Sequence, residues 1–352
     1  MMTTKSEKYF VMLATCEIVR GIKRSLLIDY AHNVTYFVSN DYEVLIRSLN
    51  RKTLEEAYNQ LDDEESKDNF KEFVDFMLAK EMAIITHDPS LFPPLSKELN
   101  DEYLSIIDAI VEVNQNYSPA LFNLICEELT MQGCMELQVR QHSLLDLEII
   151  ENILESLRAT DIGYLELHTT YNPSVSISQI KELVEKYAIL QNVYLYSGPN
   201  IMQHEVINQV EGYESLSLGY IYLLDYPFCQ GECCGLICLG NLDFSGYATN
   251  NLLRKKNGCL YKKVCFDTQG NIKNCPSMPN VYGNIKDIHL KDILLSSAFT
   301  QWGNICKDKI KVCQDCEFRY NCTDCRAFRV EKDDIYSKPL KCTYNPYTCN
   351  WK

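Results

Sequence analysis

The first 90 residues alternate between two hydrophobic patterns. Short runs of β-branched and aromatic residues, which are typical of strands, lie at 9–14, 25–30, 34–38 and 82–86. Helices are predicted at 41–49 and 53–59, and apolar residues spaced i, i+3, i+4 and i+7 from Phe70 to Met77 indicate a third. These patterns predict a small α+β unit over residues 1–90, and the prolines between 88 and 98 indicate a linker after it.

The next stretch alternates strands with amphipathic helices. The predicted strands are 135–139, 162–168, 193–196 and 217–224, and the predicted helices are 144–157 and 177–190. Alternation at this spacing predicts βα units with a parallel sheet. There are too few units for a closed eight-stranded barrel, so we expect a partial barrel or an open sheet over residues 97–228.

The remainder of the chain, 229–352, is rich in polar and turn residues and has little continuous apolar periodicity. Such a segment buries little apolar surface by itself, so we expect bound metal to contribute to its folding free energy. A hairpin is predicted with strands at 260–266 and 272–274 and with Gly270 at a turn position of positive φ. The hairpin would bring Cys259 and Cys275 near each other.

Charge and composition restrict the class of protein. The 352 residues include 34 Lys plus Arg and 48 Asp plus Glu, a formal net charge of −14, which argues against nucleic-acid binding. No signal peptide is recognised, and no stretch reaches the ~20 apolar residues of a membrane helix. We therefore expect a cytoplasmic protein without membrane contact. In that reducing compartment, the 17 cysteines are interpreted as metal ligands rather than disulfides.

The densest cysteine group is Cys313-x2-Cys316-x5-Cys322-x2-Cys325, and Cys342 follows it. Thiolates at such spacings suit soft metals. Zinc and iron–sulfur clusters are both compatible with the pattern, because each four-ligand site takes four thiolates. The spacing alone leaves these two alternatives open.

The order of these cysteines resembles the SPASM domain of radical SAM peptide-modifying enzymes. The shared elements are Cys259, Gly270-x4-Cys275, the 313–325 group and Cys342. The sequences of the segments 273–278, 283–285 and 312–327 are also similar. Over its whole length, and most strongly over 257–328, the chain is similar to the SPASM-domain peptide maturases of grasp-with-spasm systems. The family pattern usually has three residues between its last two clustered cysteines, and this chain has two.

The resemblance implies two auxiliary 4Fe-4S clusters in a SPASM domain at 229–352. The ligands of the second cluster would be Cys313, Cys316, Cys322 and Cys342. Those of the first would be Cys259, Cys275 and Cys325, with a fourth ligand left open between Cys234, which we favour, and Cys265. Two zinc ions on the same cysteines are the alternative.

The resemblance also implies a peptide partner. In this family the maturase works with a ribosomally made precursor peptide and an ATP-grasp ligase. The 1–90 unit resembles the PqqD-like winged-helix element, which captures leader peptides as an added strand on an exposed sheet edge. A structural cap on the following domain is the alternative interpretation of this unit.

One motif of the wider enzyme class is missing. No stretch of the sequence supplies Cys-x3-Cys-x2-Cys, the three ligands of a SAM-cleaving cluster. Residues 97–228 are therefore expected to form a degenerate radical-SAM-like barrel, and SAM is not expected as a cofactor. We expect a role in peptide maturation, with catalysis left open. A non-catalytic adaptor for precursor and ligase, stabilised by zinc or clusters, is the alternative.

Five polar residues lie near the predicted strands of the barrel-like region, where barrel active sites gather. They are Glu136, Arg140, His142, Glu166 and His168. Nothing in the spacing assigns them chemistry, and the two histidines are interpreted as ordinary surface or core residues. No catalytic residue is predicted.

Overall fold

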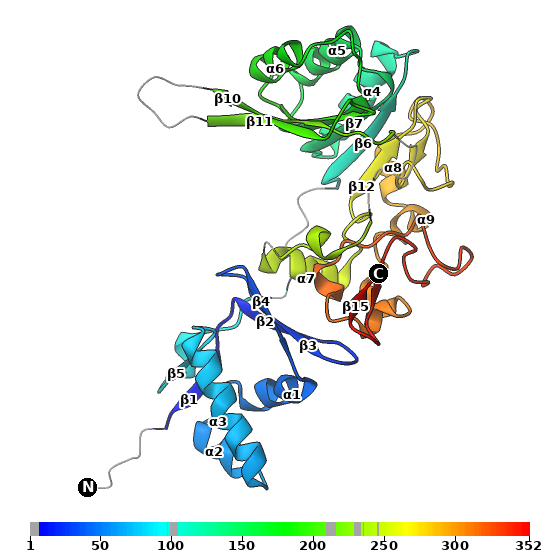
Figure 1. Cartoon of the computed structure of the whole chain (residues 1–352). Coiled ribbons are helices and arrows are strands. Elements are labelled where there is room, and N and C mark those ends of the chain that lie inside the picture. Colours follow the sequence, from blue (N-terminus) through cyan, green and yellow to red (C-terminus); the bar gives the residue numbers. More distant parts are fainter. Residues whose placement is uncertain are drawn as a thin grey trace. The chain divides into compact units, whose positions relative to one another are not determined.

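The chain passes repeatedly between two compact units (Figure 1). The computed structural model describes residues 7–96, 98, 105–208, 216–228, 234, 236–244 and 246–352. Unit 1 combines Met1–Leu99, Leu236–Gly258 and Ile305–Lys352, and unit 2 combines Asn100–Gly235 and Cys259–Asn304. This grouping divides the segment 229–352 between the units. The three domains 1–90, 97–228 and 229–352 stay a prediction.

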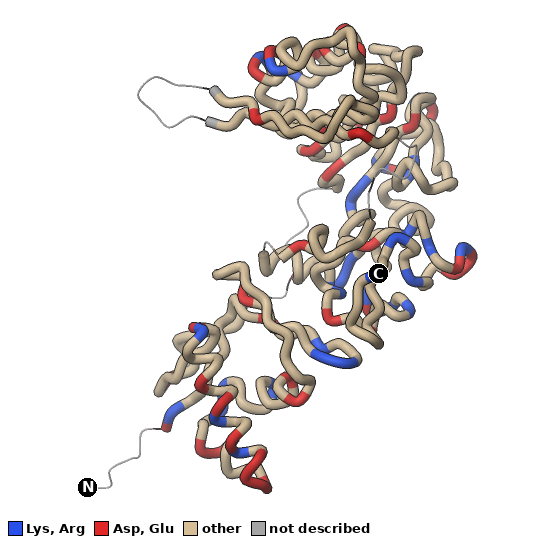
Figure 2. Tube along the Cα trace, viewed as in Figure 1, with Lys and Arg blue, Asp and Glu red and all other residues tan. Residues whose placement is uncertain are grey.

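Unit 1 begins with the small α+β arrangement expected from the hydrophobic pattern. An antiparallel sheet has the order β2 (Cys16–Arg20), β3 (Ser25–Asp29) and β4 (Val34–Val38). A separate pair joins β1 (Tyr9–Met12) to β5 (Ala83–Thr86). The helices are α1 (Asn40–Leu49), α2 (Leu54–Asn59) and α3 (Glu64–Ala79). Figure 2 shows acidic residues along α2 and α3.

Local sequence signals explain where these helices begin. The Thr53 side chain accepts a hydrogen bond from the Glu56 amide in a capping box, and the Asp63 side chain accepts one from the Ser66 amide. On α3 the predicted apolar stripe is buried against the sheet and its neighbouring helices. Strand β2 was not predicted, because Glu17 and Arg20 interrupt its apolar pattern. Arg254 and Glu43 pair with these two charges, respectively.

The cysteine-rich end of the chain completes unit 1 with short elements. They are α7 (Tyr247–Lys255), β14 (Tyr344–Asn345), β15 (Asn350–Trp351) and 3₁₀ turns at Leu239–Asn241, Lys307–Lys309, Cys313–Asp315 and Arg319–Asn321. A further 3₁₀ turn at Pro89–Leu91 follows β5 in the N-terminal segment. Val19, Leu26 and Ile28 of the N-terminal sheet share a core with Phe318 and Tyr344. The segment thus finds apolar partners that it lacks in its own sequence.

Unit 2 is built on one mixed sheet with the order β10-β11-β9-β8-β7-β6-β12-β13. The neighbours from β11 to β12 are parallel, and the two edge strands pair antiparallel. The parallel strands are β6 (Asp108–Val113), β7 (Glu136–Leu144), β8 (Tyr164–Thr170), β9 (Leu190–Tyr196), β11 (Leu216–Leu223) and β12 (Lys263–Phe266). The edges are β10 (Met202–Asn208) and β13 (Ile272–Lys273). The expected parallel-rich α/β sheet is confirmed, and its order from β10 to β13 is that of an open sheet. The degenerate radical-SAM-like barrel stays a prediction.

Helices cover one face of this sheet (Figure 1). They are α4 (Pro119–Met131), α5 (Leu147–Leu157) and α6 (Ile177–Lys186). Two short helices, α8 (Leu290–Leu294) and α9 (Ser297–Thr300), follow the β12–β13 hairpin. Every second strand residue, such as Val139, Leu167 and Val193, joins the core under the helices. Gly270 has φ +86° in the predicted hairpin turn. No helix in the described ranges is long and apolar enough to cross a membrane.

Candidate metal centres and a polar sheet face

Four of the predicted ligands lie together in unit 1, and their thiols affect one another's charge. Burial raises the pKa of Cys313 to about 12, while Lys307 opposes the rise and Cys322 and Cys342 add to it. Burial raises the pKa of Cys316 well above its usual range, and Cys313 and Cys322 contribute. The Cys342 pKa is likewise raised by burial, with a contribution from Cys322.

A tight turn brings the first two of these thiols together. The amide of Cys316 donates to the carbonyl of Cys313 over 3.0 Å, closing the 3₁₀ turn between them. Val312, just before the turn, has φ +68°, which is costly for a β-branched residue. Strain of this kind persists only where the surroundings impose it. The Cys-x2-Cys turn is therefore held by its context rather than by local preference.

A buried ammonium lies among the same thiols. Lys307 is 4% exposed, and its Nζ lies 3.2 Å from Oδ1 of Asp324. Burial acts to lower the pKa of Lys307, but Asp324, Cys322 and Cys313 raise it above the usual value. Asp324 also accepts hydrogen bonds from Arg326 and Asn257. A fixed positive charge favours thiolate over thiol nearby, and metals bind the thiolate.

This donor set fits a soft metal in chemistry. Cys313 and Cys322 are buried, Cys316 and Cys342 are half-buried, and the Lys307 ammonium offsets negative charge on Cys313 and Cys322. In the part of the chain that the structure describes, no group of three or more His, Cys, Asp or Glu is arranged to hold a metal ion. Ligation by these four cysteines stays a proposal.

The candidate ligands of the first cluster divide between the units. Cys325 belongs to unit 1, whereas Cys234, Cys259, Cys265 and Cys275 belong to unit 2. Burial raises the pKa of Cys265 well above its usual range, and Glu112 and Cys275 add to the rise. Cys259 and Cys234 lie close enough to Lys263 to affect its pKa. Burial acts to lower the pKa of Lys263, but the charges of Cys259, Asp108 and Cys234 raise it above the usual value. The choice between Cys234, which is exposed, and Cys265, which is buried, stays open.

The sheet face opposite the unit 2 helices is polar and aromatic. Strand β7 directs Gln138, Arg140 and His142 to it, because these residues alternate with the core residues Leu137 and Val139. Strand register places Arg140 between Glu112 on β6 and His168 on β8. Arg140 and His168 are both buried. Burial of such groups is costly unless they are paired, so their partners define the chemistry of the face.

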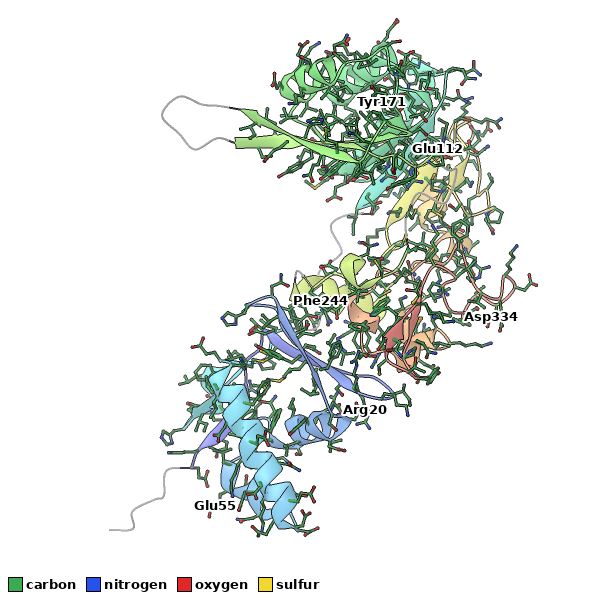
Figure 3. The ribbon with its side chains drawn as sticks, in the orientation of Figure 1. Arg20, Glu55, Glu112, Tyr171, Phe244 and Asp334 are labelled. Carbon is green, nitrogen blue, oxygen red and sulfur yellow. The ribbon has the colours of Figure 1, made fainter. Side chains whose placement is uncertain are left out.

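Two carboxylate–imidazole pairs stand on this face. Nε2 of His142 lies 2.6 Å from Oε1 of Glu112, which is labelled in Figure 3. Nε2 of His168 hydrogen-bonds to Glu166, and its Nδ1 lies 2.8 Å from the Tyr196 hydroxyl. Burial acts to raise the pKa of Glu166, but hydrogen bonds from His168 and Gln138 hold it below the usual value.

Stacked rings extend across the same face. Tyr194 stacks on Tyr222 at 4.7 Å between ring centroids and on His168 at 4.5 Å. Phe228 stacks on His142 at 5.1 Å and on Tyr196 at 4.8 Å. These contacts fix the planes of both imidazoles.

The structure thus brings together residues that the sequence singled out without a role. Arg140, His142, Glu166 and His168 share one face. Sequence reasoning missed Glu112, Tyr196 and Phe228 as their partners. Glu112 was missed because strand β6 was not predicted, and Phe228 because it follows the last strand in an irregular segment.

Comparisons with known proteins give few relatives. No protein-family model matches the chain, and no curated protein matches its sequence. Among solved structures, Streptococcus suis SuiB bound to S-adenosylmethionine is similar at TM-score 0.35 and 9% identity, covering 94% of this chain and 98% of that chain. SuiB bound to the precursor peptide SuiA is similar at TM-score 0.33 and 9% identity, with the same coverage. TM-scores of this size do not show a shared fold.

Proposed function

We propose that the protein takes part in the maturation of a ribosomally synthesised peptide and carries two thiolate-ligated 4Fe-4S clusters. The observation that supports this proposal is the buried Lys307 ammonium, whose charge acts on Cys313, Cys322 and Cys342, together with the 3₁₀ turn that joins Cys313 to Cys316. The same four positions match the order of cysteines through which the sequence resembles SPASM-domain peptide maturases. The first cluster would take Cys259, Cys275, Cys325 and either Cys234 or Cys265.

Burial supports a metal in the unit 1 group. Protonated thiols would satisfy only weak hydrogen bonds there, and free thiolates would crowd negative charge in a site of low polarity. A soft cation removes both costs, because each thiolate then bonds to metal. Zinc would meet the same requirement, so the choice of iron–sulfur clusters rests on the family resemblance.

The N-terminal sheet supports a peptide partner. Strand β4 is an edge of the β2-β3-β4 sheet and carries exposed apolar side chains, including Val34 at 37% and Phe37 at 50%. An exposed edge offers unpaired backbone groups to an extended peptide. In this proposal the precursor leader pairs with the sheet, and an ATP-grasp ligase acts on the same precursor.

A non-catalytic adaptor role is the second candidate. The observation favouring it is the absence of Cys-x3-Cys-x2-Cys from the full sequence. In that case the protein would bring precursor and ligase together, and its metal would stabilise the fold.

Leader binding is tested with the full-length protein and a fluorescent peptide made from a short open reading frame beside its gene. Val34→Lys on β4 should weaken binding by at least about tenfold, which is ~1.4 kcal/mol. Ile85→Lys is the matched control, because Ile85 is 38% exposed on strand β5 of the two-stranded β1–β5 sheet. We expect the control to bind like the native protein. Equal losses in both variants, or no binding by the native protein, would remove the recognition role.

A further inference from the structure

Strand β10 forms one edge of the unit 2 sheet, and its outer side has no partner strand in the ranges that the structure describes (Figure 1). It spans seven residues, whereas β13 at the opposite edge spans two. An edge strand of this length presents a row of unpaired backbone N–H and C=O groups. Proteins usually protect such an edge with proline, lysine or a bulge.

The edge formed by β10 has none of these protections. The segment 201–207 contains neither proline nor lysine. The ladder between β10 and β11 does shift register between Val206 and Ile207, but their partners on β11 are two residues apart. The extra residue of this bulge, Leu218, therefore lies on β11, and β10 keeps a regular alternation of side chains.

Apolar side chains are exposed on both faces of this edge. Ile201, directly before the strand, is 68% exposed, Met202 is 42% exposed and Ile207 is 44% exposed. Val206 belongs to the core under the helices, so the even-numbered residues face the helices and the odd-numbered residues face the polar side of the sheet. Open backbone groups next to exposed apolar side chains favour the addition of another strand.

The sequence of β10 is complementary to itself in one antiparallel register. A twofold axis perpendicular to the sheet keeps each face on the same side in both copies, so opposed residues share a face. With the axis at His204, side chains of the two copies meet as apolar or polar pairs: Ile201 with Ile207, Met202 with Val206, and Gln203 with Glu205. Directly opposed pairs of this kind stabilise a sheet.

The two neighbouring registers lack this complementarity. An axis at Glu205 would set two carboxylates against each other, and like charges directly opposite are destabilising. An axis at Gln203 would set the apolar Ile201 against Glu205. Only the axis at His204 matches the exposed apolar side chains with one another, so the edge specifies its register.

We propose that β10 pairs with β10 of a second copy of this chain and joins two unit 2 sheets into one continuous sheet about a twofold axis at His204. A closed twofold contact of this kind uses the same edge of both copies, so neither edge stays open. The proposal goes beyond the proposed function, because it requires neither a metal nor a precursor peptide.

Sedimentation velocity of the full-length protein over a range of concentrations tests this pairing. We expect the native protein to approach twice the monomer mass of 40.7 kDa as its concentration rises. His204→Glu and His204→Lys should each weaken self-association by about fivefold, because the axis sets two like charges against each other. Asn123→Lys, at an exposed position of α4, is the matched control and should dimerise like the native protein.

A mixture of the two charge variants tests the register itself. Pairing His204→Glu with His204→Lys places opposite charges at the axis, so the mixture should associate about fivefold or more tightly than either variant alone. Such recovery would also establish that both variants are folded.

Three results would overturn the proposal. They are a native protein that stays monomeric at every concentration, charge variants that dimerise like the native protein, and a mixture no more associated than its components. In the first case, adding the peptide made from the neighbouring short open reading frame separates the remaining occupants. Protection of the β10 amides from hydrogen exchange only with that peptide would assign the edge to the peptide instead of a second copy.

Discussion

A single buried carboxylate, Glu317, links the N-terminal sheet of unit 1 to the cysteine-rich segment. It is 1% exposed and lies directly between Cys316 and Phe318. Its Oε1 accepts hydrogen bonds from Nε of Arg24 at 2.8 Å and from the Tyr344 hydroxyl at 2.5 Å. The Arg24 guanidinium, on the β2–β3 turn, also stacks 3.5 Å over the Phe37 ring. Glu317 therefore couples the position of a predicted ligand to the sheet.

Replacing Glu317 with Ala should lower the free energy of unfolding by about 2–4 kcal/mol. The substitution leaves Arg24 and Tyr344 without their buried acceptor, and the loss of one partner of a buried pair is costly. Glu331→Ala is the control: Glu331 and its partner Lys311 are both about two-thirds exposed, so the change should stay below ~0.5 kcal/mol. Urea unfolding measures both. A similar cost in the two variants would contradict this account of Glu317.

A second residue-scale prediction concerns pH. A hydrogen bond to Glu128, and then the charge of that carboxylate, raises the pKa of His289 above 6.5. Because the folded pKa is the higher one, the interaction stabilises fully below the unfolded pKa. That stabilisation is lost as pH rises through the folded pKa. Titration of the His289 resonance should show the raised pKa, and Glu128→Gln should return it toward 6.5. No change in Glu128→Gln would refute the assigned cause.

At the scale of single residues, the sequence predicted the candidate cysteine ligands but not the buried charged residues near them. Spacing and resemblance identified Cys313, Cys316, Cys322 and Cys342 as candidate ligands, and their ligation of a metal stays a proposal. Neither could identify Lys307, because Lys307, Lys309 and Lys311 all precede Cys313 and nothing in the sequence marks Lys307 as the buried one. Glu112 lies in a mostly apolar run, Asp108–Val113, and its partner His142 comes from the neighbouring strand β7.

The elements were predicted best where one face is apolar and the other polar. Helices α3, α5 and α6 and strands β7, β8 and β9 have this pattern, and all were expected close to their observed positions. Strand β2 carries charges that distant partners neutralise. The pairing of β12 with β6 joins segments about 150 residues apart, and no local pattern encodes such a contact.

The hairpin turn gives a prediction at the scale of elements. Gly270→Ala should destabilise unit 2 by about 1–2 kcal/mol, because Gly270 has φ +86° and an added Cβ would lie 2.9 Å from Leu121 Cδ1. Gly163→Ala is the matched control, since nothing lies within 4 Å of its added Cβ. Urea unfolding of the two variants measures the difference. Equal stabilities would mean that the turn tolerates a side chain and that its geometry does not require glycine.

The whole molecule is organised differently from the order of its sequence. The segments 1–99 and 305–352 belong to one unit and share the core of Val19, Leu26, Phe318 and Tyr344. Hydrophobic patterns along the chain show which faces need partners but not which distant segment supplies them. For this reason the N-terminal unit and the cysteine-rich segment looked independent in the sequence.

The central claim is that the thiols hold iron–sulfur clusters, and iron and sulfide analysis of anaerobically purified protein tests it most directly. We predict about eight iron atoms and eight sulfides per chain, as two 4Fe-4S clusters require. Cys313→Ser should lose about half of both, while Cys349→Ser, outside the proposed ligand set, should lose none. A colourless protein with zinc or no metal, or equal losses in the two variants, would contradict the account.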